Sequence, residues 1–232
     1  TGGHCERVPE LTFMLARAAC AAQDGPYADF GLDAEEWEAL HIGAWLHDCG
    51  KVTTPEYVVD KATKLETLYD RIHEIRMRFE VLKRDAEIAC LKAIVDGEAV
   101  DTVRARLAAE LAQLDNDFAF VATCNEGGEF MAPEKQERLK SIAARTWLRT
   151  LDDRAGISHE EKQRKERTPA PELPIVEPLL ADKPEHVFER QARDRIAEDN
   201  PWGFKMRVPE LLYNKGELYN LGIARGTLAE EE

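Results

Sequence analysis

The sequence lacks any long hydrophobic run. None of its 232 residues belong to a stretch that approaches the ~20 apolar residues a membrane-spanning helix needs. The opening residues, "TGGHCERVPE", have neither the basic start nor the apolar centre of a signal peptide. We therefore expect a soluble, cytoplasmic domain, although its parent protein could be tethered to a membrane.

Positive charge is also in short supply. The chain has 31 Lys and Arg residues against 45 Asp and Glu residues, which gives a net charge of −14. An acidic surface repels the phosphate backbone of nucleic acids, so we expect no DNA or RNA partner. A protein of this composition that handles phosphates needs locally gathered cations or bound metal ions.

Paired cysteines are absent as well. The five cysteines form no CxxC pair and show no spacing typical of a zinc site. Scattered cysteines in an odd number are typical of a reducing compartment, in which thiols stay free. A glycine-rich phosphate loop is missing too, because "NEGGEF" at 125–130 follows no strand pattern.

Helical periodicity organises the first part of the chain. Apolar residues recur about every 3.6 positions over residues 4–22, which predicts an amphipathic helix. A second helix is predicted from Asp33, a suitable N-cap, to Gly50, a typical stop residue. His47 and Asp48 would then lie in the last turn of that helix.

A heptad pattern follows. Apolar residues three and four apart run from Leu65 to Ala89 and again over residues 100–121, with a break at Asp96-Gly97. This pattern predicts a long, coiled-coil-like antiparallel helical hairpin. The hairpin could close on itself or pair two copies of the chain into a homodimer. A third helix is predicted over about 133–153, followed by an extended connector in which five prolines forbid a regular helix.

The stretch "AWLHDCGK" at 44–51 ends an apolar helix with adjacent histidine and aspartate. Burying either side chain without a partner would cost several kcal/mol. In one interpretation His47 simply stabilises the negative helix end and Asp48 reaches water. In the other, both side chains bind metal, since imidazole and carboxylate suit Mn, Fe, Ni or Zn. His4 would face His47 if the first two helices pack side by side, and Lys51 could bind a phosphate oxygen.

"TGGHCERV" at 1–8 and "LHIGAWLHDCGK" at 40–51 together resemble the opening of an HD-GYP domain, a branch of the HD superfamily of metal-dependent phosphohydrolases. The resemblance implies an all-α fold and divalent transition metal ions, Fe or Mn, with two or more in the complete domain. It implies that His4, His47 and Asp48 are metal ligands and that Asp48 bridges two ions. It also places Lys51 at the substrate phosphate, so that Asp48 and Lys51 are the expected catalytic residues.

The resemblance is interrupted. The family pattern that follows H-D-x-G-K begins at 55–59 and resumes only at 223–232. We therefore predict a first HD-type part at 1–60 and a re-entry at 208–232. The insertion between them comprises the hairpin at 61–126 and the third helix with its Pro-rich connector at 127–207. The family's remaining metal ligands and its G-Y-P motif are expected after Glu232, so these 232 residues alone should have little activity.

These features predict a fragment of a signalling phosphodiesterase that hydrolyses cyclic di-GMP with a metal-activated water. Its parent could carry sensor domains. One alternative is an HD-type phosphohydrolase of another nucleotide or small phosphate ester. Another is a non-catalytic helical module for signalling or dimerisation. The other histidines are assigned no chemistry: His41 is expected to be structural, His73 to flank the hairpin, and His159 and His186 to lie in polar loops without partners.

Overall fold

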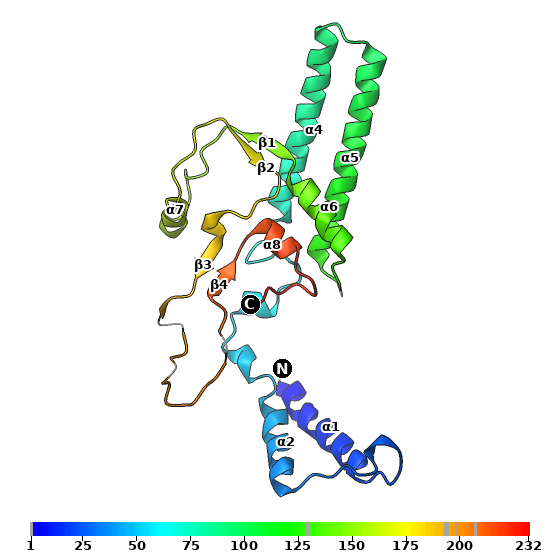
Figure 1. Ribbon diagram of the computed structural model, residues 1–232, viewed down its shortest axis with the longest axis vertical. Helices are drawn as coiled ribbons and strands as arrows, with labels where there is room; N and C mark the ends of the chain where they lie inside the picture. The colour runs from blue at the N-terminus through cyan, green and yellow to red at the C-terminus, as the bar shows by residue number, and fades with distance from the viewer. Residues whose placement is uncertain (1, 129, 193–194, 198, 207) are drawn as a thin grey trace. The chain divides into compact units, whose positions relative to one another are not determined.

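Helices make up most of the described chain, as the periodicity predicts (Figure 1). The computed structural model describes residues 2–128, 130–192, 195–197, 199–206 and 208–232. The chain divides into two units, Thr1–Val59 and Asp60–Glu232. Four short strands, which the sequence did not lead us to expect, form two small antiparallel sheets in the second unit.

The first unit is built on helices α1 (Gly2–Cys20) and α2 (Ala34–Leu46). A 3-10 turn, η1 (Gly25–Tyr27), lies between them, and η2 (Cys49–Val52) and α3 (Glu56–Val59) follow. Asp33 caps α2 as predicted. Its carboxylate accepts the Glu36 backbone N–H at 2.8 Å, and the Glu36 carboxylate accepts the Asp33 backbone N–H at 2.9 Å. The rings of Phe13 and Trp37 stack at 5.6 Å, which packs α1 against α2.

The second unit begins with the predicted hairpin, α4 (Ile72–Val95) and α5 (Val100–Glu126), turned at Gly97 with a φ of +94°. Phe79 and Phe118 meet edge to face at 5.4 Å across the hairpin. The helix begins at Ile72 and not at Leu65, because the Asp70 carboxylate accepts the Ile72 N–H at 3.0 Å and ends the preceding loop. Leu68, which the heptad pattern placed in the seam, is therefore 92% exposed.

The predicted third helix is too long. Helix α6 spans Pro133–Ala143, and Thr146–Arg149 then forms strand β1. Strand β1 pairs antiparallel with β2 (Ile175–Pro178), inside the segment predicted as a connector. Thr146 and Trp147 have the β-branched and aromatic side chains that favour a strand. Pairing with β2 thus overrides the helical periodicity that predicted a helix here.

The remaining elements are short. They are α7 (His159–Lys165), η3 (Pro184–His186), β3 (Val187–Glu189), β4 (Leu211–Asn214) and α8 (Glu217–Leu221). Strands β3 and β4 pair antiparallel, and the ring of Phe188 stacks on that of Tyr213 at 4.1 Å. Among the residues with a described structure, no helix combines the length and the apolar character of a membrane span.

Two distant segments meet in the second unit. The Lys64 ammonium donates to the carbonyls of Leu221 at 3.0 Å and Ile223 at 2.9 Å, and Lys61 pairs with Glu232 at 2.5 Å. Both lysine side chains are almost fully buried. The residues just before the hairpin thus lie against the last residues of the chain.

The packing of the hairpin can be tested at Leu114, which is 1% exposed in the core. Leu114→Ala should lower the free energy of unfolding by about 2–5 kcal/mol, since it removes buried methyl groups and leaves a cavity. Leu68→Ala is the matched control, with an expected change within about 0.5 kcal/mol because Leu68 is exposed. Denaturant unfolding measures both, and equal losses would contradict the packing described.

His159 and His186 both differ from their predictions. His159 begins helix α7 and its Nε2 lies 3.0 Å from Gln163 Nε2, and His186 lies in η3 and has partners too. The ring Nδ1 of His186 accepts the Lys183 backbone N–H at 3.1 Å. Burial of the ring, countered in part by Glu217, lowers the pKa of His186 to about 4. The imidazole is therefore neutral at pH 7.

This pKa predicts a pH dependence of stability. The unfolded chain binds the proton of His186 first, at a pKa of about 6.5. The stabilisation is therefore complete above that pH and is lost as the pH falls toward about 4. His186→Gln should flatten the fall in the free energy of unfolding between these two values.

Candidate metal site

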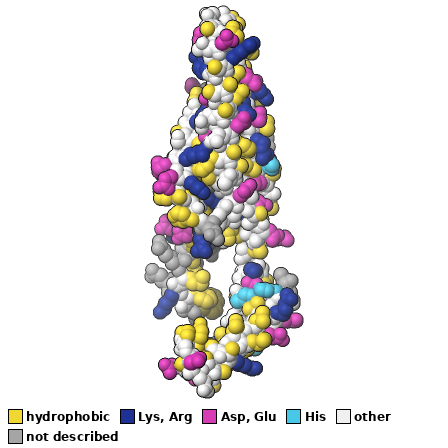
Figure 2. Space-filling model, turned by 90° about the vertical axis from the view of Figure 1, so that its right-hand side faces the viewer, with side chains coloured by type: hydrophobic (Ala, Val, Ile, Leu, Met, Phe, Trp, Pro, Cys, Tyr) yellow, Lys and Arg dark blue, Asp and Glu magenta, His cyan; other side chains and the backbone are white. Residues whose placement is uncertain are grey.

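Three potential metal ligands meet in the first unit. His4 lies in the first turn of α1, His47 is the C-cap of α2, and Asp48 follows it. The two histidine Nε2 atoms are 3.3 Å apart, and they lie 3.7 Å (His4) and 3.4 Å (His47) from Asp48 Oδ2. Figure 2 shows histidine side chains gathered at the surface of this unit. The three residues named from the sequence thus form one cluster.

The spacing fits a shared ion. Nitrogen and oxygen ligands lie about 2.0–2.2 Å from zinc and similar ions, so two ligands at a tetrahedral angle are about 3.4 Å apart. The observed separations of 3.3–3.7 Å are of this size. One carboxylate and two imidazoles also form a suitable donor set for a divalent transition metal.

The tautomer of His47 is fixed by the backbone. Its Nδ1 lies 2.8 Å from the carbonyl oxygen of Ala44, which can only accept, so Nδ1 carries the hydrogen. In the neutral ring Nε2 is then unprotonated, and its lone pair points toward His4 and Asp48. Metal-binding histidines are commonly oriented by such a contact at the other ring nitrogen.

Lys51 neutralises Asp48. Its ammonium lies 3.0 Å from each carboxylate oxygen. The hydrogen bond from Lys51, with smaller effects of His47 and His4, holds the pKa of Asp48 below its ordinary value, although partial burial opposes the shift. Asp48 is therefore a charged ligand at neutral pH. The Lys51 side chain is 60% exposed, so an oxyanion can reach its ammonium from solvent.

The backbone explains how adjacent residues serve one site. Neighbouring side chains on a continuous helix point about 100° apart and do not face each other. We predicted that α2 would run to Gly50, but it ends at Leu46 and Asp48 adopts φ −110° and ψ 9°. This break turns the Asp48 side chain to the same side as His47.

The similarity to a known protein family lies in a different part of the chain. Residues 174–232 match the family model described as HD domain. The match relates the chain to the HD superfamily. HD domains are in general metal-dependent phosphohydrolases that bind divalent ions, in agreement with the His and Asp cluster. The match covers less than half of the chain, excludes this cluster and does not single out the HD-GYP branch. No curated protein and no solved structure matches the chain.

Metal binding tests the cluster. Asp48→Asn should weaken binding of Mn²⁺ by about 10-fold or more, because it removes the one anionic ligand. Lys51→Gln should instead tighten it severalfold, because Lys51 competes with the ion for Asp48. Glu38→Gln, an exposed change on the same helix, controls for the loss of one charge. Equilibrium dialysis with metal analysis measures all three, and equal effects of Asp48→Asn and Glu38→Gln would exclude the site.

Proposed function

We propose that the chain is part of an HD-type metal-dependent phosphodiesterase that hydrolyses cyclic di-GMP. The observation that carries this proposal is the convergence of His4, His47 and Asp48 at ligand spacing, with the Lys51 ammonium on the Asp48 carboxylate. Divalent ions bound there would supply an activated water and polarise a phosphate oxygen. The order of these residues in the chain follows the family motif.

Each side chain has a defined task. His47 presents Nε2 because its Nδ1–H is held by the Ala44 carbonyl at 2.8 Å. Asp48 offers two oxygens, enough to bridge two ions. Lys51 balances Asp48 while the site is free of metal. With a divalent ion held by Asp48, the Lys51 ammonium would be free to contact a phosphate oxygen as a point charge.

The second unit supports an interrupted HD domain. Lys61 and Lys64, at the start of the proposed insertion, contact Leu221, Ile223 and Glu232 in the segment that follows it. The HD-domain match includes those last residues. In our proposal, residues 1–60 and 208–232 belong to one HD-type domain of a cytoplasmic signalling protein, and the helices between them are an insertion.

Two observations favour alternatives. The family match is to HD domains in general, which keeps another nucleotide or phosphate ester open as the substrate. The outer surface of α4 exposes Ile88, Leu91 and Val95, whose exposed fractions are 48%, 64% and 85%. Such a stripe at heptad spacing would suit a homodimer of a non-catalytic module.

The deciding experiment compares the 232-residue chain with a chain extended at both ends. Cyclic di-GMP hydrolysis is assayed with Mn²⁺ or Fe²⁺, and bound metal is quantified in parallel. The extended chain should form linear product, and Asp48→Ala should abolish that activity while Glu38→Ala leaves it intact. The 232 residues alone should be nearly inactive.

The other outcomes separate the alternatives. Bound metal without hydrolysis of cyclic di-GMP would move the assignment to another phosphate ester. If the chain neither binds metal nor forms product, the assignment would be the non-catalytic helical module. High metal-dependent turnover by the 232 residues alone would contradict the prediction that essential ligands lie outside them.

A further inference from the structure

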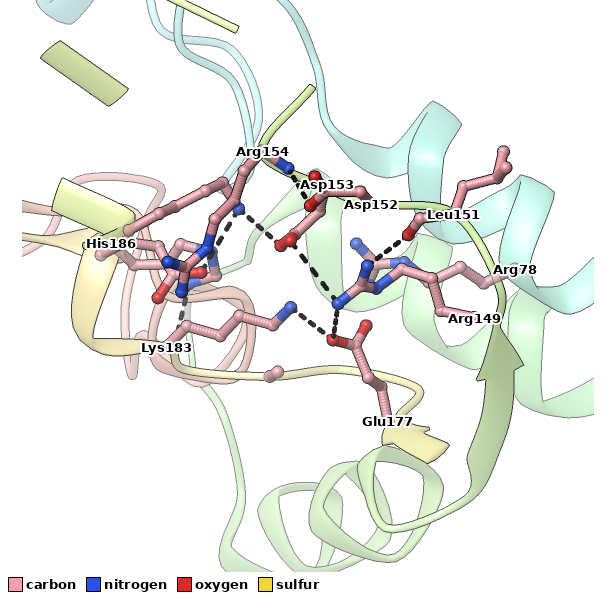
Figure 3. Close-up of polar contacts among 12 residues, drawn as sticks. Arg78, Arg149, Leu151, Asp152, Asp153, Arg154, Glu177, Lys183 and His186 are labelled. Carbon is pink, nitrogen blue, oxygen red and sulfur yellow. Dashed lines mark hydrogen bonds and ion pairs between the residues drawn. The ribbon is translucent and has the colours of Figure 1, made fainter. Parts of the chain in front are cut away.

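The second unit contains a cavity of about 630 Å³. Its walls come from α4, β1, α7, β3 and the turn before α8, and Figure 3 shows polar contacts among several of its charged residues. This volume lies within the roughly 300–1,000 Å³ that is typical of small-molecule sites. The cavity shares no residue with the candidate metal site.

Most charges in the floor are paired with each other. Arg149, 8% exposed, lies between Glu177 at 3.1 Å and Asp153 at 3.5 Å, and Lys183 also reaches Glu177 at 3.1 Å (Figure 3). Lys165 pairs with Asp153 at 2.8 Å. Arg78 pairs in the same way with the buried Glu217 at 2.8 Å. These ion pairs build a fixed polar wall.

For three cations of the lining, the described residues provide no carboxylate within ion-pair distance. Arg71 donates only to the backbone carbonyls of Leu65 and Lys215, within the described residues. The guanidinium of Arg164 lies 4.4 Å from the ring centre of Phe188, and its buried Nε has no hydrogen-bond partner there. The Lys215 ammonium lies 5.2 Å from the same ring. Glu161 is the one lining carboxylate for which the described residues provide no ion pair.

Arg164 and Arg71 both repel the Lys215 ammonium. Burial, and then Arg164 and Arg71, lower the pKa of Lys215. Burial likewise lowers the pKa of Arg71. Gathering uncompensated positive charge in a partly buried place is unfavourable, and a bound anion would remove the cost. The lining has seven Lys and Arg residues and six Asp and Glu residues, so it carries one positive charge in excess, in a chain whose net charge is −14.

Part of the lining is apolar. Met77, Val81 and Trp147 border the cavity, and Met77 is 63% exposed although it faces this hollow. An apolar wall beside a few convergent polar groups is the usual composition of a site for an organic ligand. Three cations suit a ligand with two or more negative charges better than a single carboxylate.

We propose that this cavity binds a phosphorylated small molecule of nucleotide size. Its phosphates would contact Arg71, Arg164 and Lys215, and its organic part would lie against Trp147 and Met77. This ligand site would be separate from the candidate metal cluster.

Calorimetric titration of the full chain tests this site. The background variant Asp48→Ala and a chelator remove any contribution of the metal cluster, so the result does not depend on the proposed hydrolysis. The probes are ATP, pyrophosphate and adenosine. ATP should bind, and adenosine should not bind measurably. Arg164→Gln and Lys215→Gln should each weaken the binding of ATP by about 10-fold or more.

Control variants separate specific from general charge effects. Arg84→Gln and Lys140→Gln remove exposed cations elsewhere and should leave ATP binding unchanged. Lys215→Arg should retain binding, which distinguishes lost charge from lost folding. Met77→Ala should weaken the binding of ATP and leave the binding of pyrophosphate unchanged, because it alters the apolar wall alone.

Three results would overturn the proposal. The first is no binding of either ATP or pyrophosphate to the unaltered cavity. The second is equal weakening by Arg164→Gln and Arg84→Gln, which would indicate a diffuse charge effect. The third is adenosine binding as tightly as ATP, which would remove the role of the three cations.

Discussion

The second unit depends on a buried polar junction around Asn125. The Asn125 side-chain oxygen accepts the Leu65 N–H at 2.8 Å, its backbone carbonyl accepts the Lys64 N–H at 2.9 Å, and its amide nitrogen donates to Asp70. Lys64, 3% exposed, extends the junction to the carbonyls near the chain's end. Removing any partner would leave a buried donor or charge unsatisfied, at a cost of several kcal/mol for the ammonium. The junction therefore holds the base of the hairpin and the last segment together.

The same physical constraint shapes both proposed sites. A chain with a net charge of −14 repels phosphates over most of its surface. It can bind them only where cations gather or where metal ions supply the charge. At the candidate metal site Lys51 stands beside the ligand cluster. In the cavity Arg164 and Lys215 flank one aromatic ring. An anion could therefore contact the exposed Lys51 ammonium at the first site and the Arg164 and Lys215 side chains at the second.

The helices could be predicted because their signals are local. Periodicity located α1, α2 and the hairpin, and Asp33 as an N-cap marked the start of α2. The convergence of His4, His47 and Asp48 could be predicted because these residues lie in a recognisable motif. The β1–β2 ladder could not, since its strands are separated along the chain by a long loop and pair only through tertiary structure. The cavity cations also lacked a signal, because Arg71, Arg164 and Lys215 come from three distant segments and form no motif.

The end of α2 links local structure to chemistry most directly. A helix that continued through Asp48 would point the adjacent side chains of His47 and Asp48 in diverging directions. Ending the helix at Leu46 leaves the Ala44 carbonyl in contact with His47, which sets the ring's tautomer. The following 3-10 turn brings Lys51 back to Asp48, since residues three apart share one side of such a turn. The break that orients the ligands thus also supplies the cation that balances them when no metal is bound.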